Sequence, residues 1–450
     1  MLLLFYNLIY LGIFSLVFIV IFALILKHNR LLLKTICVFL FLHIILVGFI
    51  LLELHRFKFN LSNSIFRNDG DAYSANAWQI STALTKRIPD MASVAQMRGI
   101  HIPNRGWGLV KYYNEYIKKA IIDPVGEYEV GYITYFYSII YASYGYMPVL
   151  IHGMNVFLHL LTAIVIYKSS ELIFNNKIAA YIASLFFLLN PISFYYSSTK
   201  LRDPIIIFSI YFSIYCFIMI LKEKRYWYAV LLPPLFIICK LIKDVFFLPL
   251  LIVFAASSMV ILFKRSKKIF FIFTMIILLI SSNRYTPISA KIKQHIKSAL
   301  TTAVGHQRGF YTTGGSVYRI FILDKDSRDY TLKDWAGYIF KGWYHLLSEP
   351  ILSADRPSKF LLFFPIRVIF LILCALAVPG ILMAIRYGHT EAVIFISILV
   401  ILGTGIAMSS GNVGTMLRHR DAITPVIFIF SAFYITRLCY GSNPDNMRKE

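Results

Sequence analysis

Two aspartates separated by one glycine form a pair that could do acid–base chemistry. They are Asp69 and Asp71, in the stretch NDGDAYSANAWQIS at residues 68–81. Paired carboxylates can accept a proton from a nucleophilic hydroxyl group or hold a divalent cation. The alternative is a solvated turn, because Asp and Gly are common turn residues, with Asp71 as the N-cap of the helix that follows. We expect this helix to begin at Ala72 and to end near Lys86.

A second group of charged residues lies in LNPISFYYSSTKLRDPIIIF, at residues 189–208. Lys200, Arg202 and Asp203 are close together in a short polar link between two apolar runs. Two cations and a carboxylate could bind a phosphate group and supply a second acid. Alternatively, Pro204 fits the first turn of a helix that Asp203 caps, and the basic side chains extend to the membrane surface. The sequence leaves both interpretations open.

A third group lies in GNVGTMLRHRDAITP, at residues 411–425, where Arg418, His419 and Arg420 follow one another closely. Arginine binds phosphate through two parallel hydrogen bonds, so a phosphate site is one interpretation. Anchoring at the membrane interface is the other. Lys243, in CKLIKDVFF, is a less specific candidate, because a lysine near a helix end often extends to the interface.

The composition indicates what kind of elements hold these residues. Hydrophobic residues make up 58% of the 450 residues, charged residues make up 15%, and the mean hydropathy is +0.68. A soluble domain has about 45–50% apolar and about 25% charged residues. We therefore predict an all-α polytopic integral membrane protein. The net charge of +23 is spread among the apolar runs, which argues against a nucleic-acid partner. The five cysteines lie in or beside these runs, so no disulfide framework is expected.

A helix that crosses a bilayer needs about 20 apolar residues. Eleven runs of the sequence approach or exceed this length: 2–26, 33–53, 147–168, 177–196, 204–221, 226–241, 245–264, 268–283, 361–386, 391–409 and 422–438. The stretch 131–146 is shorter and rich in tyrosine, which favours the water–lipid boundary. We expect a juxtamembrane helix there, lying along the interface.

These runs divide the chain into five parts. They are two transmembrane helices (1–53), an outer loop with the acidic motif and juxtamembrane helices (54–146), transmembrane helices 3–8 (147–283), a large outer loop (284–360), and transmembrane helices 9–11 with a cytoplasmic tail (361–450). Most of the Lys and Arg of the short loops fall in one set of alternate loops, which the positive-inside rule makes cytoplasmic. The prediction is a multi-pass protein of the cell (inner) membrane, with its N-terminus outside, its C-terminus inside and its charged clusters on the outer, periplasmic face.

The order of these features resembles the GT-C superfamily of membrane glycosyltransferases. An acidic motif follows an early span, the aromatic stretch GYITYFYSIIYASYG comes later, an NP…S…RDP link follows two spans, and an arginine-bearing loop precedes the last helix. The resemblance covers residues 54–221 and, more loosely, 410–430. It implies a sugar donor carried on polyprenyl phosphate or polyprenyl diphosphate and used on the outer face of the membrane.

The resemblance also implies roles for the acids. The first-loop acid of the family is a catalytic base or a metal-holding carboxylate. A D-x-x-x-Y pattern places it on Asp69, with Tyr73 as the tyrosine, and Asp71 is the competing choice. The second acid falls on Asp203. A divalent metal ion is therefore a candidate cofactor, with these three aspartates as its candidate ligands.

The resulting expectation is an inverting glycosyltransferase that moves a sugar from the polyprenyl donor to a glycan, lipid or protein acceptor of the cell envelope. Asp69 or Asp71 would act as general base. Donor phosphate would be held by Lys200, Arg202, Arg418 and Arg420, with substrate contacts from Tyr73, His419 and Lys243. One alternative is a polymerase or ligase for polysaccharide repeat units on undecaprenyl diphosphate, in which basic residues would dominate. Another is a lipid or glycan transporter or flippase, which the placement of the charges in loops disfavours.

Overall fold

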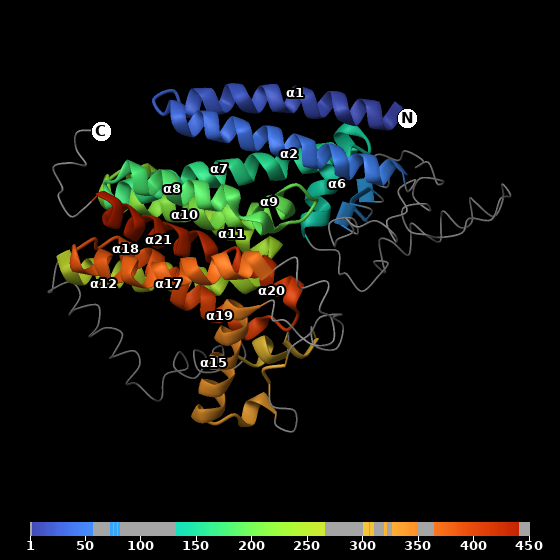
Figure 1. Cartoon of the computed structure of the whole chain (residues 1–450). Coiled ribbons are helices and arrows are strands. Elements are labelled where there is room, and N and C mark those ends of the chain that lie inside the picture. The colour runs from blue at the N-terminus through green and yellow to red at the C-terminus, as the bar shows by residue number, and fades with distance from the viewer. Residues whose placement is uncertain are drawn as a thin grey trace. The chain divides into compact units, whose positions relative to one another are not determined.

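The computed structural model describes residues 2–56, 73–74, 76–78, 80–81, 132–265, 300–305, 307–309, 319–321, 326–349 and 364–440, and all regular elements in these residues are helices (Figure 1). The chain divides into two compact units. Unit 1 comprises Met1–Ala163 and Leu188–Ser209, and unit 2 comprises Ile164–Phe187 and Ile210–Glu450.

The long helices agree with the prediction of an all-α membrane protein. Among the described residues, six helical segments are long and apolar enough to cross a membrane. They lie in α1 (Leu2–Ile25), α2 (Arg30–Arg56), α7 (Pro148–Phe174), α10 (Asp203–Lys222), α17 (Phe364–Arg386) and the interrupted helix Ala392–Ser409. Two bent pairs would raise the number to eight: α8 (Lys177–Leu189) with α9 (Pro191–Ser197), bent by 62°, and α20 (Val413–Arg420) with α21 (Thr424–Tyr440), bent by 52°.

The count of eleven spans stays a prediction. Tyr226–Ile242 and Phe247–Ile261 are apolar helices shorter than the spans above, and the predicted span 268–283 lies outside the described residues. The first of these short segments is a 3₁₀ helix, η2 (Tyr226–Leu231), followed by α11 (Leu232–Ile242). The prolines of this segment lie in the first turn of α11, where the N–H that proline lacks has no partner within the helix.

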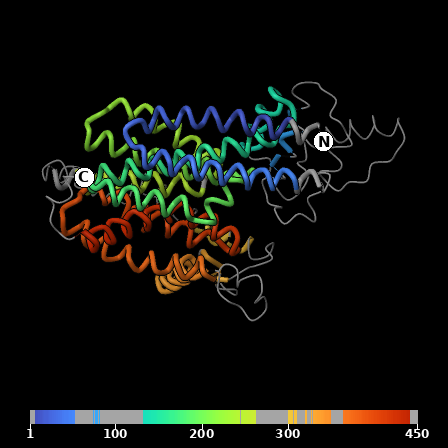
Figure 2. The backbone as a smooth tube through the Cα atoms, turned by 45° about the horizontal axis from the view of Figure 1, so that its top comes forward, coloured from blue at the N-terminus to red at the C-terminus, as the bar shows by residue number. Residues whose placement is uncertain are grey.

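In unit 1, α1 and α2 form an antiparallel hairpin (Figures 1 and 2). Asn29 caps α2 by accepting a hydrogen bond from the N–H of Leu32 at 3.0 Å. The hairpin packs on the first half of α7, where the rings of Phe18 and Phe157 stack with their centroids 4.6 Å apart.

The predicted juxtamembrane segment 131–146 forms a helix, α6 (Tyr132–Tyr144). The described residues between 73 and 81 are also helical, as expected for the segment after the acidic pair. This segment packs on α6, because the hydroxyl groups of Ser74 and Tyr141 are hydrogen-bonded at 2.6 Å and the ring of Trp78 lies edge-on to Tyr141. The position of α6 along the membrane surface stays a prediction.

In unit 2, α17 and α21 lie side by side (Figure 1). Gly380 permits this close approach, since a side chain at this position would collide with the carbonyl group of Phe430. The hydroxyl group of Ser431 donates to the carbonyl oxygen of Leu373 at 2.6 Å. Beside this pair lie α18 (Ala392–Ser397) and a π-helical segment (Ile398–Leu402) that continues into α19 (Gly403–Ser409). Helix α12 (Phe247–Arg265) packs on α18 and the π-helical segment, and η3 (Asp244–Phe246) packs on α12 and α19.

The large predicted outer loop 284–360 contributes η4 (Ser327–Asp329) and the amphipathic helix α15 (Leu332–Ser348). Thr331 and Asp334 form a capping box at the start of α15. The helix docks on α19, where Tyr338 donates to the carbonyl oxygen of Met408 at 2.5 Å. Burial raises the pKa of Tyr338, which keeps its hydroxyl group protonated as a donor. Trp343 Nε1 donates to Thr404 Oγ1 at 3.1 Å, and Gly342 fits against Ala407.

Candidate active site

The first candidate site lies in unit 1, at the segment 198–202 that joins α9 to α10; we call this segment the link. Asn190 caps α9 by accepting a hydrogen bond from the N–H of Ile192, and Pro191 occupies the first turn of that helix. Helix α10 begins at Asp203, with Pro204 in its first turn as predicted. Both helix boundaries are therefore explained by local cap chemistry.

The carbonyl groups of four consecutive residues, 198–201, are all hydrogen-bonded by side chains of α6 and α7. The bonds run from His152 Nδ1 to Ser198 O (2.7 Å), from Asn155 Nδ2 to Thr199 O and Leu201 O (2.7 Å each), and from Tyr137 OH to Lys200 O (3.2 Å). A buried carbonyl group without a partner costs free energy, so these side chains fix the backbone of the link in one conformation.

Tyr137 is fully buried, and its burial raises the pKa of the phenol, so the side chain stays neutral and donates. A further hydrogen bond, of 2.9 Å, joins His43 Nε2 of α2 to the hydroxyl group of Ser197 at the end of α9. Three helices, α2, α6 and α7, therefore hold the link and the helix that leads into it.

Three charged residues lie in or next to the link, and one of them contacts Tyr73. Lys200 and Asp203 are only 2% and 5% exposed, whereas Arg202 is half-buried. The Arg202 guanidinium lies 5.6 Å from the centre of the Tyr73 ring, a cation–π arrangement. Arg202, Asp203 and Tyr73 all interact electrostatically with Tyr137. The structure thus brings together Tyr73, Arg202 and Asp203, which sequence analysis proposed from distant segments; we call these residues and Lys200 the link cluster.

Asp69 and Asp71 lie outside the described residues. They precede Tyr73 by four and two positions, so their proposed role stays a prediction. Among the described residues, no three His, Cys, Asp or Glu side chains gather in a way that could hold a metal ion. The proposed metal ligands include both undescribed aspartates, so metal binding also stays a prediction.

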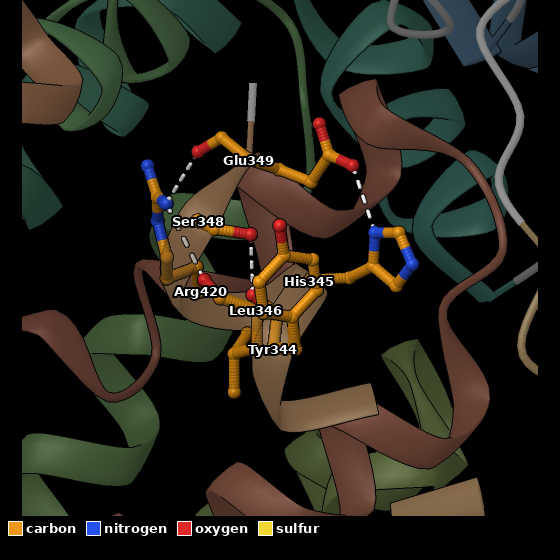
Figure 3. Close-up of polar contacts among 6 residues, drawn as sticks. All are labelled: Tyr344, His345, Leu346, Ser348, Glu349 and Arg420. Carbon is orange, nitrogen blue, oxygen red and sulfur yellow. Dashed lines mark hydrogen bonds and ion pairs between the residues drawn. The ribbon is translucent and has the colours of Figure 1, made fainter. Parts of the chain in front are cut away.

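The second candidate site lies in unit 2, around Arg420 (Figure 3). This side chain is 2% exposed. Its Nη1 donates to the carbonyl oxygens of Glu349 at 2.9 Å and Leu346 at 3.4 Å, and its guanidinium lies 4.1 Å from the centre of the Phe370 ring. The carboxylates of Asp421 and Glu349 interact electrostatically with it. Arg420 therefore satisfies carbonyl groups at the C-terminal end of α15, a structural role that sequence analysis did not propose.

The other predicted site residues of unit 2 are His419, Lys243 and Arg418. His419 is buried, forms a 3.1 Å hydrogen bond with Ser410 Oγ, and lies edge-on to the ring of Phe246. The ammonium group of Lys243 lies 5.5 Å from the centre of the same ring, and Arg418 is half-buried in α20. Phosphate binding by these residues stays a prediction.

Sequence analysis missed His345 and Glu349, whose side chains form a 2.9 Å ion pair or hydrogen bond through Nδ1 and Oε1 (Figure 3). Their spacing of four residues could have predicted this contact, because residues four apart on a helix lie next to each other. It also missed His152, Asn155 and Tyr137. No local pattern marks those three, since their partners lie 44–63 positions away.

Comparison of the chain with protein families, with curated proteins and with solved structures finds no match. The fold places the protein among all-helical proteins with six to eight described helices, counting bent pairs, of membrane-spanning length and composition. The function is therefore inferred from the link cluster and its surroundings.

We expect Asn155→Leu, which keeps the volume but removes the amide, to destabilise unit 1 by about 2–5 kcal/mol, because two buried carbonyl groups lose their donor. The midpoint of thermal unfolding in detergent and amide exchange across residues 197–203 measure this effect. Asn7→Leu is the matched control, because the buried Asn7 accepts a longer bond of 3.3 Å from the N–H of Val149. Equal effects of the two substitutions would contradict the proposed role of Asn155.

Proposed function

We propose that the protein is a membrane glycosyltransferase that transfers a sugar from a polyprenyl-phosphate or polyprenyl-diphosphate donor to a cell-envelope glycan, lipid or protein. The observation that carries this proposal is the link cluster. A rigid backbone segment presents two cations and a carboxylate, and Tyr73, which follows the acidic pair in the sequence, lies against one of the cations.

Arg202 is the group best placed to hold the donor phosphate. Its guanidinium lies 5.6 Å from the centre of the Tyr73 ring, and a cation–π contact leaves the N–H groups of an arginine able to bind phosphate. Being half-buried, it is reachable from the surface of unit 1. The buried Lys200 adds positive charge nearby, in surroundings where water screens charge poorly.

These cations would act on the leaving group. When the bond between the anomeric carbon and the phosphate oxygen breaks, the electron pair goes to the phosphate, and negative charge grows on its oxygens. Preorganised cations in a site with little water stabilise such charge by about 3–4 kcal/mol for each group. Because the carbonyl groups of the link are already held, little reorganisation is needed during the reaction.

Asp69 or Asp71 would accept the proton of the acceptor hydroxyl group as its oxygen attacks the anomeric carbon. Attack from the side opposite the phosphate inverts the anomeric configuration. The products are the glycosylated acceptor, the polyprenyl phosphate or diphosphate, and a proton held on the aspartate. We place this step on the outer face of the membrane, in agreement with the charge distribution of the loops.

Binding of undecaprenyl phosphate to the full chain in lipid nanodiscs tests the phosphate site. We expect Arg202→Gln to weaken binding by about 10–100-fold, because a charged hydrogen bond contributes about 1.5–3 kcal/mol. Lys177→Gln, which removes the same charge from an exposed position at the start of α8, should bind like the wild type.

Two results would contradict the proposal. The wild type could fail to bind both undecaprenyl phosphate and undecaprenyl diphosphate, or Arg202→Gln could bind as tightly as the control. Titrating both lipids in parallel also identifies which phosphate state the site prefers.

A further inference from the structure

Helix α15 lies at the end of unit 2 where the segment Ala392–Ser409 ends. Figure 1 shows it running across the direction of α17. Its contacts with this segment are at Thr404, Ala407 and Met408. At 1.5 Å per residue, these contacts lie within about 8 Å of the end of the segment. Amphipathic helices in membrane surfaces are buried about 5–10 Å into the boundary of head groups and acyl chains. A helix this close to the end of a membrane span would lie at the depth of the interface.

The helix is apolar on two sides. Tyr338, Gly342 and Leu346 are buried against the rest of unit 2. Opposite these residues the helix exposes Phe340 (75%) and Tyr344 (54%), and Leu332 (88%) is exposed at the edge of that side, about 80° around the helix from Phe340. Burial of apolar surface contributes about 25 cal/mol of stabilisation for each Å², and this contribution is lost if the face is exposed to water. A large apolar patch rimmed by polar groups marks a membrane or protein contact.

The charges beside this face indicate whether it contacts a membrane or another protein. Lys333 and Lys341 are exposed on the same side of the helix. The one acidic side chain of α15, Asp334, is engaged in the capping box with Thr331. An anionic lipid surface complements two lysines, whereas a symmetric contact between two copies of this face would bring lysines together. The rings of Tyr344 and Trp343 are also of the kind that gathers at the interface.

We propose that α15 lies in the surface of the membrane, with Leu332, Phe340 and Tyr344 inserted between the lipids of one leaflet. Lys333 and Lys341 contact the phosphate groups of anionic phospholipids, their aliphatic stems lying along the apolar face. The inner face of the helix is fixed to unit 2 by Tyr338, Trp343 and the bonds from Arg420. This inference is independent of the chemistry at the link cluster.

Photo-crosslinking from the full chain in nanodiscs of phosphatidylglycerol and phosphatidylcholine tests this arrangement. We replace Phe340 or Tyr344 by p-benzoylphenylalanine, which keeps an aromatic ring at an exposed position, and measure lipid adducts by intact mass spectrometry. Trp335→p-benzoylphenylalanine, on the side of the same helix that packs against Tyr330 and Tyr338, is the matched control. We expect the lipid adducts at 340 and 344 to exceed those at 335 several-fold.

A second arm tests the lysines. With the crosslinker at position 340, Lys333→Gln together with Lys341→Gln should lower the ratio of phosphatidylglycerol to phosphatidylcholine adducts, by about five-fold for each lysine in full contact, since each contributes about 1 kcal/mol. The proposal is overturned by crosslinks mainly to a second copy of the chain, by equal lipid adducts at 340 and 335, or by an unchanged lipid ratio.

Discussion

Replacing Asp69 and Asp71 together by Asn should slow sugar transfer by about 10²–10⁴-fold, the contribution expected of a general base. Asparagine keeps the size of each side chain and cannot accept the proton of the acceptor hydroxyl group. Binding of undecaprenyl phosphate should stay close to that of the wild type, because we assign the phosphate to Arg202 and Lys200. The measurement is the rate at which a labelled polyprenyl-linked sugar is consumed in membranes that contain the protein and its native acceptors.

The single variants Asp69→Asn and Asp71→Asn decide which aspartate acts as the base. Asp90→Asn, in the same predicted outer loop, is the control for loss of a carboxylate and should keep full activity. Retained transfer in the double variant would remove both aspartates from catalysis. If the aspartate variants kept transfer while Arg418→Gln lost it, a polymerase or ligase driven by basic residues would become the better interpretation.

Features that depend on neighbouring residues could be predicted from the sequence. The start of α10 at Asp203–Pro204 follows from the conformational preference of proline in a first helical turn. Where the structure describes the long apolar runs, they form helices whose ends differ by a few residues from the prediction, and the run 177–196 is bent between Leu189 and Pro191. Tyr73 and the RDP link were paired through the family resemblance, and the structure places Tyr73 against Arg202.

Features that depend on distant contacts could not be predicted. Residues 413–420 were taken as a loop because they are polar, yet they form α20, capped by Asn412 through Gly414 and Thr415. The capping role of Asn412 could have been predicted from the sequence. The burial that stabilises so short a helix could not, because it depends on residues distant in the chain. Asn155 has no local signature, because its two partners are 44 and 46 positions away.

The contacts of Arg420 could not be predicted from the sequence either, and its substitution should have the second large effect. We expect Arg420→Met to release the C-terminal end of α15. The substitution removes a charged donor from the carbonyl groups of Leu346 and Glu349, at a cost of about 3 kcal/mol. It also removes a cation that interacts with the buried carboxylate of Asp421. Amide exchange in residues 343–349 should become faster, on the order of 10²-fold, because local opening follows the lost free energy.

Arg418→Met, two positions away on α20, is the control for loss of positive charge, and exchange in the α1–α2 hairpin is the internal reference. Arg420→Lys keeps the charge with a single ammonium group and should give an intermediate rate. If transfer is lost in Arg420→Met while exchange in α15 is unchanged, Arg420 is a phosphate ligand rather than a structural support. If exchange rises and the photo-crosslinks from Phe340 to lipid fall with it, the guanidinium fixes α15 at the membrane surface, and any loss of transfer follows from that displacement.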